Sequence, residues 1–352
     1  MLDTLLSLPL LSYLLIPAMS SYGTSLNLVF FYITWITLVL SLPPLKVELV
    51  GTAAVRFVFY LLPSFTFFLF DIIFPSTAIG IKAQGAAGLP TGKRGRRCGK
   101  REAKVVGWAV ANLCLGIGVQ GLVEVVLTRA LGWRSALRIA ARLPLPWEVV
   151  RGLLAGIVGR ELLQYLIHRY ILHSSSRSRS LFPATHLTRY HDTWYHIVLK
   201  SPYPLTAHYD HPLPYLFGRF LPTFLPAAAL RFHLLTYLLY LSLVSLEETF
   251  THSGYSTMPT NFFIGGMARR NELHVLSKGC GNYGGWGLLD WVCGTTVDMG
   301  GDDGSDEGDN EDGNGNGERE KDVDIDDVLA AVVEEPKKKA KGLKNRSRKA
   351  RT

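Results

Sequence analysis

The stretch WEVVRGLLAGIVGRELLQYLIHRYILH, residues 147–173, decides the fold class. Its first part, Trp147 to Ile167, is mostly apolar and has the length of about 20 residues that a helix needs to cross a bilayer core. His168 and His173 follow directly at the end of this segment. The sequence therefore predicts a membrane helix that ends in a histidine-rich connection.

Three further segments come near the length of a membrane span: residues 26–42, 57–74 and 105–127. Of the 352 residues, 48% are hydrophobic and only 19% charged, and the charge is concentrated in a few runs. Such a composition is unusual for a soluble globular protein. We therefore predict an all-α fold, a polytopic membrane helical bundle with four spans.

The apolar region 214–246 differs from these segments. It is too short for two full crossings, and Pro222, Pro226, Arg231 and His233 interrupt it. Irregular backbone at membrane depth is tolerated only where protein or water satisfies its polar groups. We expect a re-entrant or interfacial helical hairpin here.

The basic link between the second and third segments sets the predicted orientation. Lysines and arginines are dense between residues 82 and 104, so the positive-inside rule puts this link and the histidine region on the cytosolic side. Arg129, Arg134, Arg138 and Arg142 oppose this assignment, because they would lie on the other side. The basic runs are not interleaved with aromatic residues, so no nucleic-acid partner is expected.

All ten histidines lie between His168 and His274. A single histidine is more often a surface or interfacial residue, but a set of them beside a membrane indicates a multi-metal cage, since imidazole binds iron, zinc and copper. The H-E-x-x-H pattern of zinc hydrolases is missing, which makes a membrane zinc hydrolase the weakest alternative.

The spacing of the first pair constrains the local backbone. His168 and His173 are five residues apart, or about 140° around an α-helix. They can share one helix face only if the helix ends or bulges before His173.

Several ordered motifs carry a family resemblance. They are His168-Arg169 with His173, the run SPYPLTAHYDHP at 201–212, His252-Ser253-Gly254-Tyr255 with Pro259, Asn282-Tyr283-Gly284, Leu289-Asp290-Trp291 and Gly294-Thr295. Together they resemble the sterol desaturase and fatty acid hydroxylase superfamily from about Trp147 to Thr296. Residues Thr193, Ile197, Asn271 and Val275 stand where the family pattern has histidine.

The resemblance implies a non-haem di-iron centre held by about eight histidines in the endoplasmic reticulum membrane. It would use molecular oxygen to oxidise a sterol, fatty acyl or sphingoid lipid, with electrons from a small haem carrier and its NAD(P)H-dependent flavin reductase. The candidate metal ligands are His168, His173, His191, His196, His211, His252 and His274, with His186, His208, Glu161 and Glu248 as further ligands or supporting groups. Glu161 has an alternative role, pairing with Arg160 inside the bundle.

The expected domains are N-terminal membrane segments at 1–80, a basic cytosolic loop at 81–104, a membrane-embedded hydroxylase-like domain at 105–299 and a tail at 300–352. The tail is acidic and then basic, and its Gly and Asp content predicts disorder. Because several histidines of the pattern are replaced, a second interpretation stays open. It is a membrane scaffold or lipid-binding relative that has lost catalysis.

Overall fold

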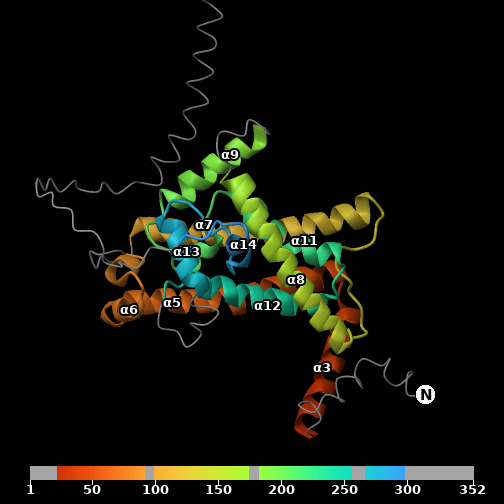
Figure 1. Cartoon of the computed structure of the whole chain (residues 1–352). Coiled ribbons are helices and arrows are strands. Elements are labelled where there is room, and N and C mark those ends of the chain that lie inside the picture. The colour runs from red at the N-terminus through yellow and green to blue at the C-terminus, as the bar shows by residue number, and fades with distance from the viewer. Residues whose placement is uncertain (1–21, 92–98, 174–181, 256–265, 298–352) are drawn as a thin grey trace, which may run out of the picture.

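The computed structural model describes residues 22–91, 99–173, 182–255 and 266–297 (Figure 1). Within these ranges every extended regular element is a helix, and extended pairing is limited to two isolated bridges. The prediction of an all-α fold is thus confirmed for this part of the chain. The expected disordered tail, the central part of the basic loop and Pro259 lie outside the described residues.

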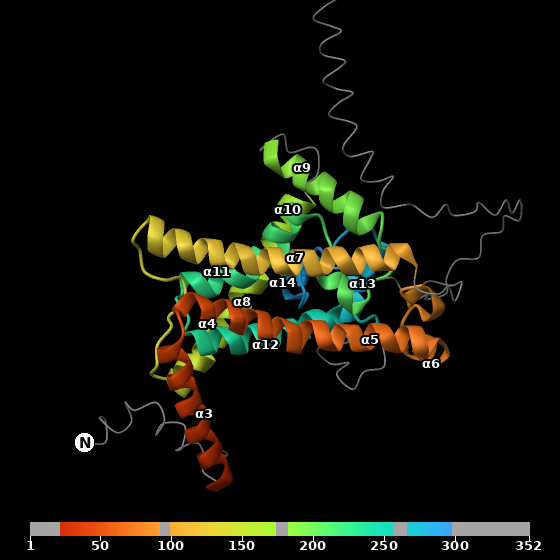
Figure 2. The same cartoon turned by 180° about the vertical axis from the view of Figure 1, so that it is seen from behind.

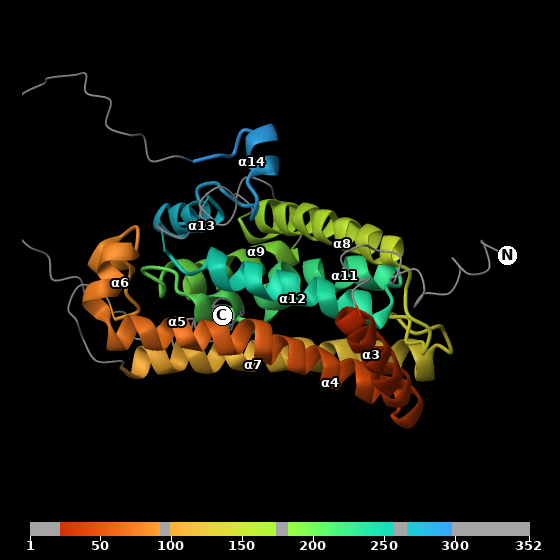
Figure 3. The same cartoon turned by 90° about the horizontal axis from the view of Figure 1, so that it is seen from below.

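Two long helices form one layer of the bundle. The first runs without a break through α4 (Pro44–Arg56), the π-helical turn η2 (Phe57–Leu61) and α5 (Leu62–Ile73). The second joins α7 (Lys100–Val125) to the π turn η4 (Val126–Ala130). Figures 2 and 3 show them side by side. Both are long and apolar enough to cross a membrane.

The first of these helices corrects one expectation. Residues 43–56 were expected to link two spans, but Pro44 opens a helix that continues through them. Two of the three charged residues of this stretch, Glu48 and Arg56, are buried, and Lys46 is exposed. Glu48 accepts a hydrogen bond from Gln120 at 2.7 Å, and Arg56 donates to Glu248 at 2.5 Å.

A second layer packs on this pair (Figure 3). It contains α12 (Leu234–Thr251), which contacts α4 and η2, and α11 (Leu221–Ala229), which lies against α8 (Pro146–Ile167). The helix α3 (Tyr22–Ser41) projects from one end of the bundle, and the short helix α6 (Pro75–Ile81) lies at the other (Figures 1 and 3). The expected hairpin is helical: η8 (Leu216–Phe220) and α11 turn back into α12 at residues 230–233.

Apart from the exposed Arg151, the outer face of α8 is apolar. Its exposed large side chains recur every three or four residues: Trp147, Val150, Leu154, Val158, Leu162 and Leu166. Contiguous apolar faces of this kind are rare on soluble monomers and indicate contact with lipid or protein. However, α8 also carries four charged residues, so the four-span topology stays a prediction.

The end of α8 carries the elements that build the site. They are η5 (His168–Leu172), α9 (Phe182–His191), η6 (Asp192–His196), η7 (Pro204–His208), α10 (Pro212–Tyr215), α13 (Gly266–Leu276) and α14 (Leu288–Val292). The turn η7 lies between α7, α5 and α12, where Tyr60 donates a hydrogen bond to the Leu205 carbonyl at 3.1 Å. Its position fixes the segment that leads from α9 back into the bundle.

Candidate metal centre

Two π-helical turns bring together histidines that an α-helix would separate. The His173 amide donates to the His168 carbonyl at 2.9 Å, and the Ile197 amide donates to Asp192 at 3.0 Å, which are the i→i+5 bonds of a π turn. Each turn holds one extra residue. His168 and His173 therefore lie with ring centroids 5.0 Å apart, and so do His191 and His196.

The rings of five histidines lie together in a group here called the five-histidine cluster: His168, His173, His191, His196 and His274. Ligand atoms of four of them, His168, His173, His191 and His274, lie within 4.8 Å of one another, and His196 forms a second such group with His173 and Asp192. The ring of His173 lies 5.0 to 5.1 Å from each of the other four. Those four form a closed ring, with neighbouring centroids 4.5 to 5.5 Å apart. The arrangement is a square pyramid of imidazoles with His173 at its apex.

The outer nitrogens of three rings are fixed by hydrogen bonds. His168 Nδ1 donates to the Tyr283 carbonyl at 2.9 Å, His274 Nδ1 donates to the Gly281 carbonyl at 2.6 Å, and His191 Nδ1 lies 2.6 Å from Asp210 Oδ2. Partners of this kind set the tautomer of metal-bound histidines and orient their rings.

The opposite nitrogens of the same rings are left without partners. The Nε2 atoms of His168, His191 and His274 are buried and make no hydrogen bond, and His196 Nδ1 is in the same state. Buried polar atoms are nearly always satisfied, so several unsatisfied lone pairs in one place call for a cation. The donor set of the larger group, His168, His173, His191 and His274, is entirely imidazole, which suits iron, zinc or copper. The residues present thus fit a metal ion.

The protonation states of the histidine rings agree with metal binding. Burial lowers the pKa of His274 to about 4, and burial together with the neighbouring rings holds the pKa of His168 well below its usual range. The pKa of His196 is lowered to about 2, again chiefly by burial. These rings are therefore neutral at physiological pH, the form that binds a metal.

A small cavity borders the cluster. It has a volume of about 20 Å³, and its lining includes His168, His191 and His274 of the pyramid base together with Tyr195 and Arg219. Such a volume holds roughly one water-sized molecule. A small ligand in this cavity would therefore lie beside the rings of His168, His191 and His274.

Other candidate residues lie outside the five-histidine cluster. His211 accepts a hydrogen bond from the Leu213 amide as the N-cap of α10 and stacks on Tyr190, while His186 is exposed on α9. Glu161 does not pair with Arg160, which binds Glu247 instead. One oxygen of Glu161 accepts from the Trp286 amide at 2.9 Å, and the other is buried without a hydrogen-bond partner.

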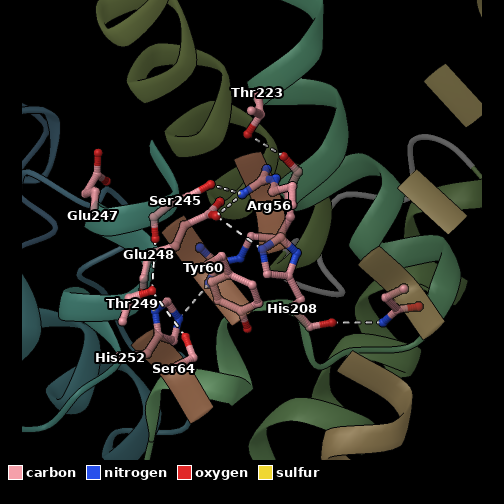
Figure 4. A network of polar contacts seen from close by, with 12 residues as sticks. Arg56, Tyr60, Ser64, His208, Thr223, Ser245, Glu247, Glu248, Thr249 and His252 are labelled. Atoms are coloured by element: carbon pink, nitrogen blue, oxygen red, sulfur yellow. Dashed lines mark hydrogen bonds and ion pairs between the residues drawn. The ribbon is translucent and has the colours of Figure 1, made fainter. Parts of the chain in front are cut away.

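The remaining candidates belong to a buried polar network (Figure 4). Glu248 Oε2 accepts from Arg56 at 2.5 Å and from His208 Nε2 at 3.1 Å. His252 Nδ1 donates to the Glu248 carbonyl at 2.9 Å, and Arg219 donates to His252 Nε2 at 3.2 Å. We call Arg56, Arg160, His208, Arg219, Glu247, Glu248 and His252 the arginine network.

Two functional residues were not singled out from the sequence. Asp210 orients His191, and its place between His208 and His211 is a signal that could have revealed it, because metal-bound histidines commonly pair with carboxylates. Arg219 lies in the apolar hairpin, where an isolated charge indicates a buried role.

Comparison with known proteins agrees with the arrangement of the site. A family model described as fatty acid hydroxylase matches residues 153–295, the region that contributes every residue of the five-histidine cluster. This match supports membership of the sterol desaturase and fatty acid hydroxylase superfamily, as the resemblance indicated. The family implies oxidation of lipids. No solved structure matches the chain.

Proposed function

We propose that this protein is an iron-dependent membrane enzyme that hydroxylates or desaturates a lipid with molecular oxygen. The observation that carries the proposal is the convergence of the Nε2 atoms of His168, His191 and His274, all buried and without partners. A neutral, buried imidazole cage leaves a bound metal cationic and able to bind oxygen.

The residues of the chain have separate tasks in this proposal. The five-histidine cluster would hold iron, which would activate molecular oxygen, the oxidant for an unactivated C–H bond, with electrons from a reducing partner. Asp210 and the carbonyls of Gly281 and Tyr283 hold the ligand rings in orientation. Tyr195 and Leu172 line the cavity beside the rings and limit the entry of water.

We further propose a multi-pass protein of the endoplasmic reticulum membrane with the histidine cluster on the cytosolic side. Two contacts support a common side for the basic loop and the site. Lys82 donates to the Ser253 carbonyl at 3.1 Å, next to His252, and Arg101 donates to Val198, near His196. A cytosolic site could receive electrons from a small haem protein and its flavin reductase.

The test is lipid turnover by the full chain in nanodiscs, loaded anaerobically with Fe(II) and then given oxygen and a reducing system. Fatty acyl, sterol and sphingoid lipids are the substrates, and mass spectrometry detects a gained oxygen atom or the loss of two hydrogens. We expect turnover by the wild type and by His186→Ala, whose residue lies outside the cluster. His191→Ala should give no product. Protein that retains iron and turns over none of these lipids would contradict the proposal.

A second function has a specific observation in its favour. Val275, at a position where the family pattern has histidine, is buried in an apolar cluster with Phe68 and Val105. A chain that uses ligand positions for packing could act as a lipid-binding scaffold. Absence of bound iron in the same experiment would favour this interpretation.

A further inference from the structure

The arginine network lies across a cavity from the five-histidine cluster. Arg219 and His252 line a cavity together with His168 and His274. Three of the histidines in the motifs that resemble the family, His208, His211 and His252, are not in the cluster. Whether they could hold a second ion depends on the state of their ring nitrogens.

His252 has no free nitrogen for a metal. Its Nδ1 donates to the Glu248 carbonyl, so its lone pair is on Nε2, and that atom accepts a hydrogen bond from Arg219 at 3.2 Å. Arginine is not deprotonated in proteins. The guanidinium and a metal ion therefore exclude each other at this nitrogen.

His208 is engaged at both nitrogens as well. Its Nε2 donates to Glu248 Oε2 at 3.1 Å, and its Nδ1 lies 3.2 Å from the Tyr215 hydroxyl. The ring also packs edge-on against Tyr60, with centroids 4.4 Å apart. His211 is half-buried and caps α10.

The charge of the network also opposes a second cation. Arg56, Arg160 and Arg219 face two glutamates, so the network already carries one net positive charge. Arg56, Arg160 and Glu248 are each no more than 7% exposed. A divalent ion in such a place would add two further charges to a network whose two carboxylates already pair with Arg56 and Arg160, at a large desolvation cost.

We propose that this chain binds a single metal ion in the five-histidine cluster, and that the Arg219 guanidinium replaces a second ion beside His252. This inference rests on the metal site of the proposed function, and it replaces the pair of irons that the family resemblance implies with one. The ligand atoms support it, because those of His168, His173, His191 and His274 all lie within 4.8 Å of one another. His196 joins them through His173, whose Nε2 lies 3.3 Å from His196 Nε2.

The experiment measures metal per chain by elemental analysis after anaerobic Fe(II) loading of the full-length protein and removal of loosely bound ions. We expect one iron per chain, and X-ray absorption with nitrogen neighbours and no iron–iron distance. Two irons per chain, or none, would overturn the proposal.

A pair of matched variants locates the ion. His252→Ala should keep one iron per chain, whereas His274→Ala should lower iron content at least tenfold. Elution as a single species and an unchanged thermal transition check that both variants are folded. Loss of iron from folded His252→Ala protein would overturn the assignment.

These results separate the inference from the proposed function. One iron per chain without lipid turnover would support the single-ion site and contradict the proposed enzymatic function. Lipid turnover with two irons per chain would support the proposed enzyme and overturn the single-ion site.

Discussion

His168 and His173 are joined by a single π-helical hydrogen bond of 2.9 Å, and this bond decides that their rings lie 5.0 Å apart. On an α-helix the same two residues would point about 140° apart. A second π-helical turn brings His191 and His196 together in the same way. π turns of this kind are rare and frequently mark functional sites.

The apex histidine depends on a glycine. Gly279 has φ +87°, and a Cβ on it would lie 2.3 Å from Cε1 of His173. Gly279→Ala should therefore displace His173 and weaken iron binding about tenfold or more. Gly294→Ala is the matched control, since it has φ +63° with no atom within 4 Å of the added Cβ. Both should lose about 1–2 kcal/mol of stability from the backbone alone. Equal iron affinity in the two variants, measured by competition with a chelator, would contradict the role of Gly279.

Asp210 should raise the iron affinity of the five-histidine cluster by holding the ring of His191. Replacing Asp210 by Asn removes the charge that holds His191 Nδ1 at 2.6 Å, so iron affinity should fall about 10- to 100-fold. Glu161→Gln is the comparison, because Glu161 hydrogen-bonds to the Trp286 amide instead of a histidine. Chelator competition should give wild-type affinity for Glu161→Gln. A larger loss of iron affinity in Glu161→Gln than in Asp210→Asn would contradict the role of Asp210 in holding His191.

The register of the second π turn can be tested with a displaced histidine. Ile197 occupies a histidine position of the family pattern, but its side chain is 52% exposed. We expect His196→Ala to lose iron and the added substitution Ile197→His to restore none of it, because position 197 points away from the cluster. Ile197→His alone should keep wild-type iron content. Rescue by the double variant would show that the chain can shift its register.

The Glu248–Arg56 pair should stabilise the fold without holding the metal. Glu248→Gln leaves Arg56 and Arg160 buried with one carboxylate fewer, and breaking a buried pair typically costs about 3–5 kcal/mol. Thermal unfolding in detergent should show this loss, while iron per chain stays unchanged in the folded fraction. Adding Arg56→Met should recover part of the stability. A double variant less stable than the sum of the two single losses would contradict the pairing.

Membrane orientation gives a fifth test. In a chain without its other cysteines, Cys280, which is exposed next to Gly281, should react with an impermeant maleimide from the cytosolic side. Lys100→Cys should react from the same side, and Arg134→Cys only after the membrane is opened. Labelling of Cys280 and Lys100→Cys from opposite sides would refute the proposed orientation.

The sequence by itself determined the helical fold class, the family resemblance of residues 153–295 and the region that holds the candidate metal ligands. These follow from local information: apolar segment length, the confinement of histidine to 168–274 and the order of the motifs. The constraint that the helix must end or bulge before His173 was also readable, because it rests on helix geometry alone.

Only the tertiary structure decided which histidines meet and which do not. His252 and His274 have equally suggestive sequence positions, yet one receives Arg219 at its lone pair and the other keeps a buried Nε2 without a partner. Tertiary structure also decided the role of Glu248, which pairs with Arg56, 192 positions away in the sequence. A ring nitrogen becomes a metal donor or a hydrogen-bond acceptor according to what faces it, and that depends on the packing of segments far apart in sequence.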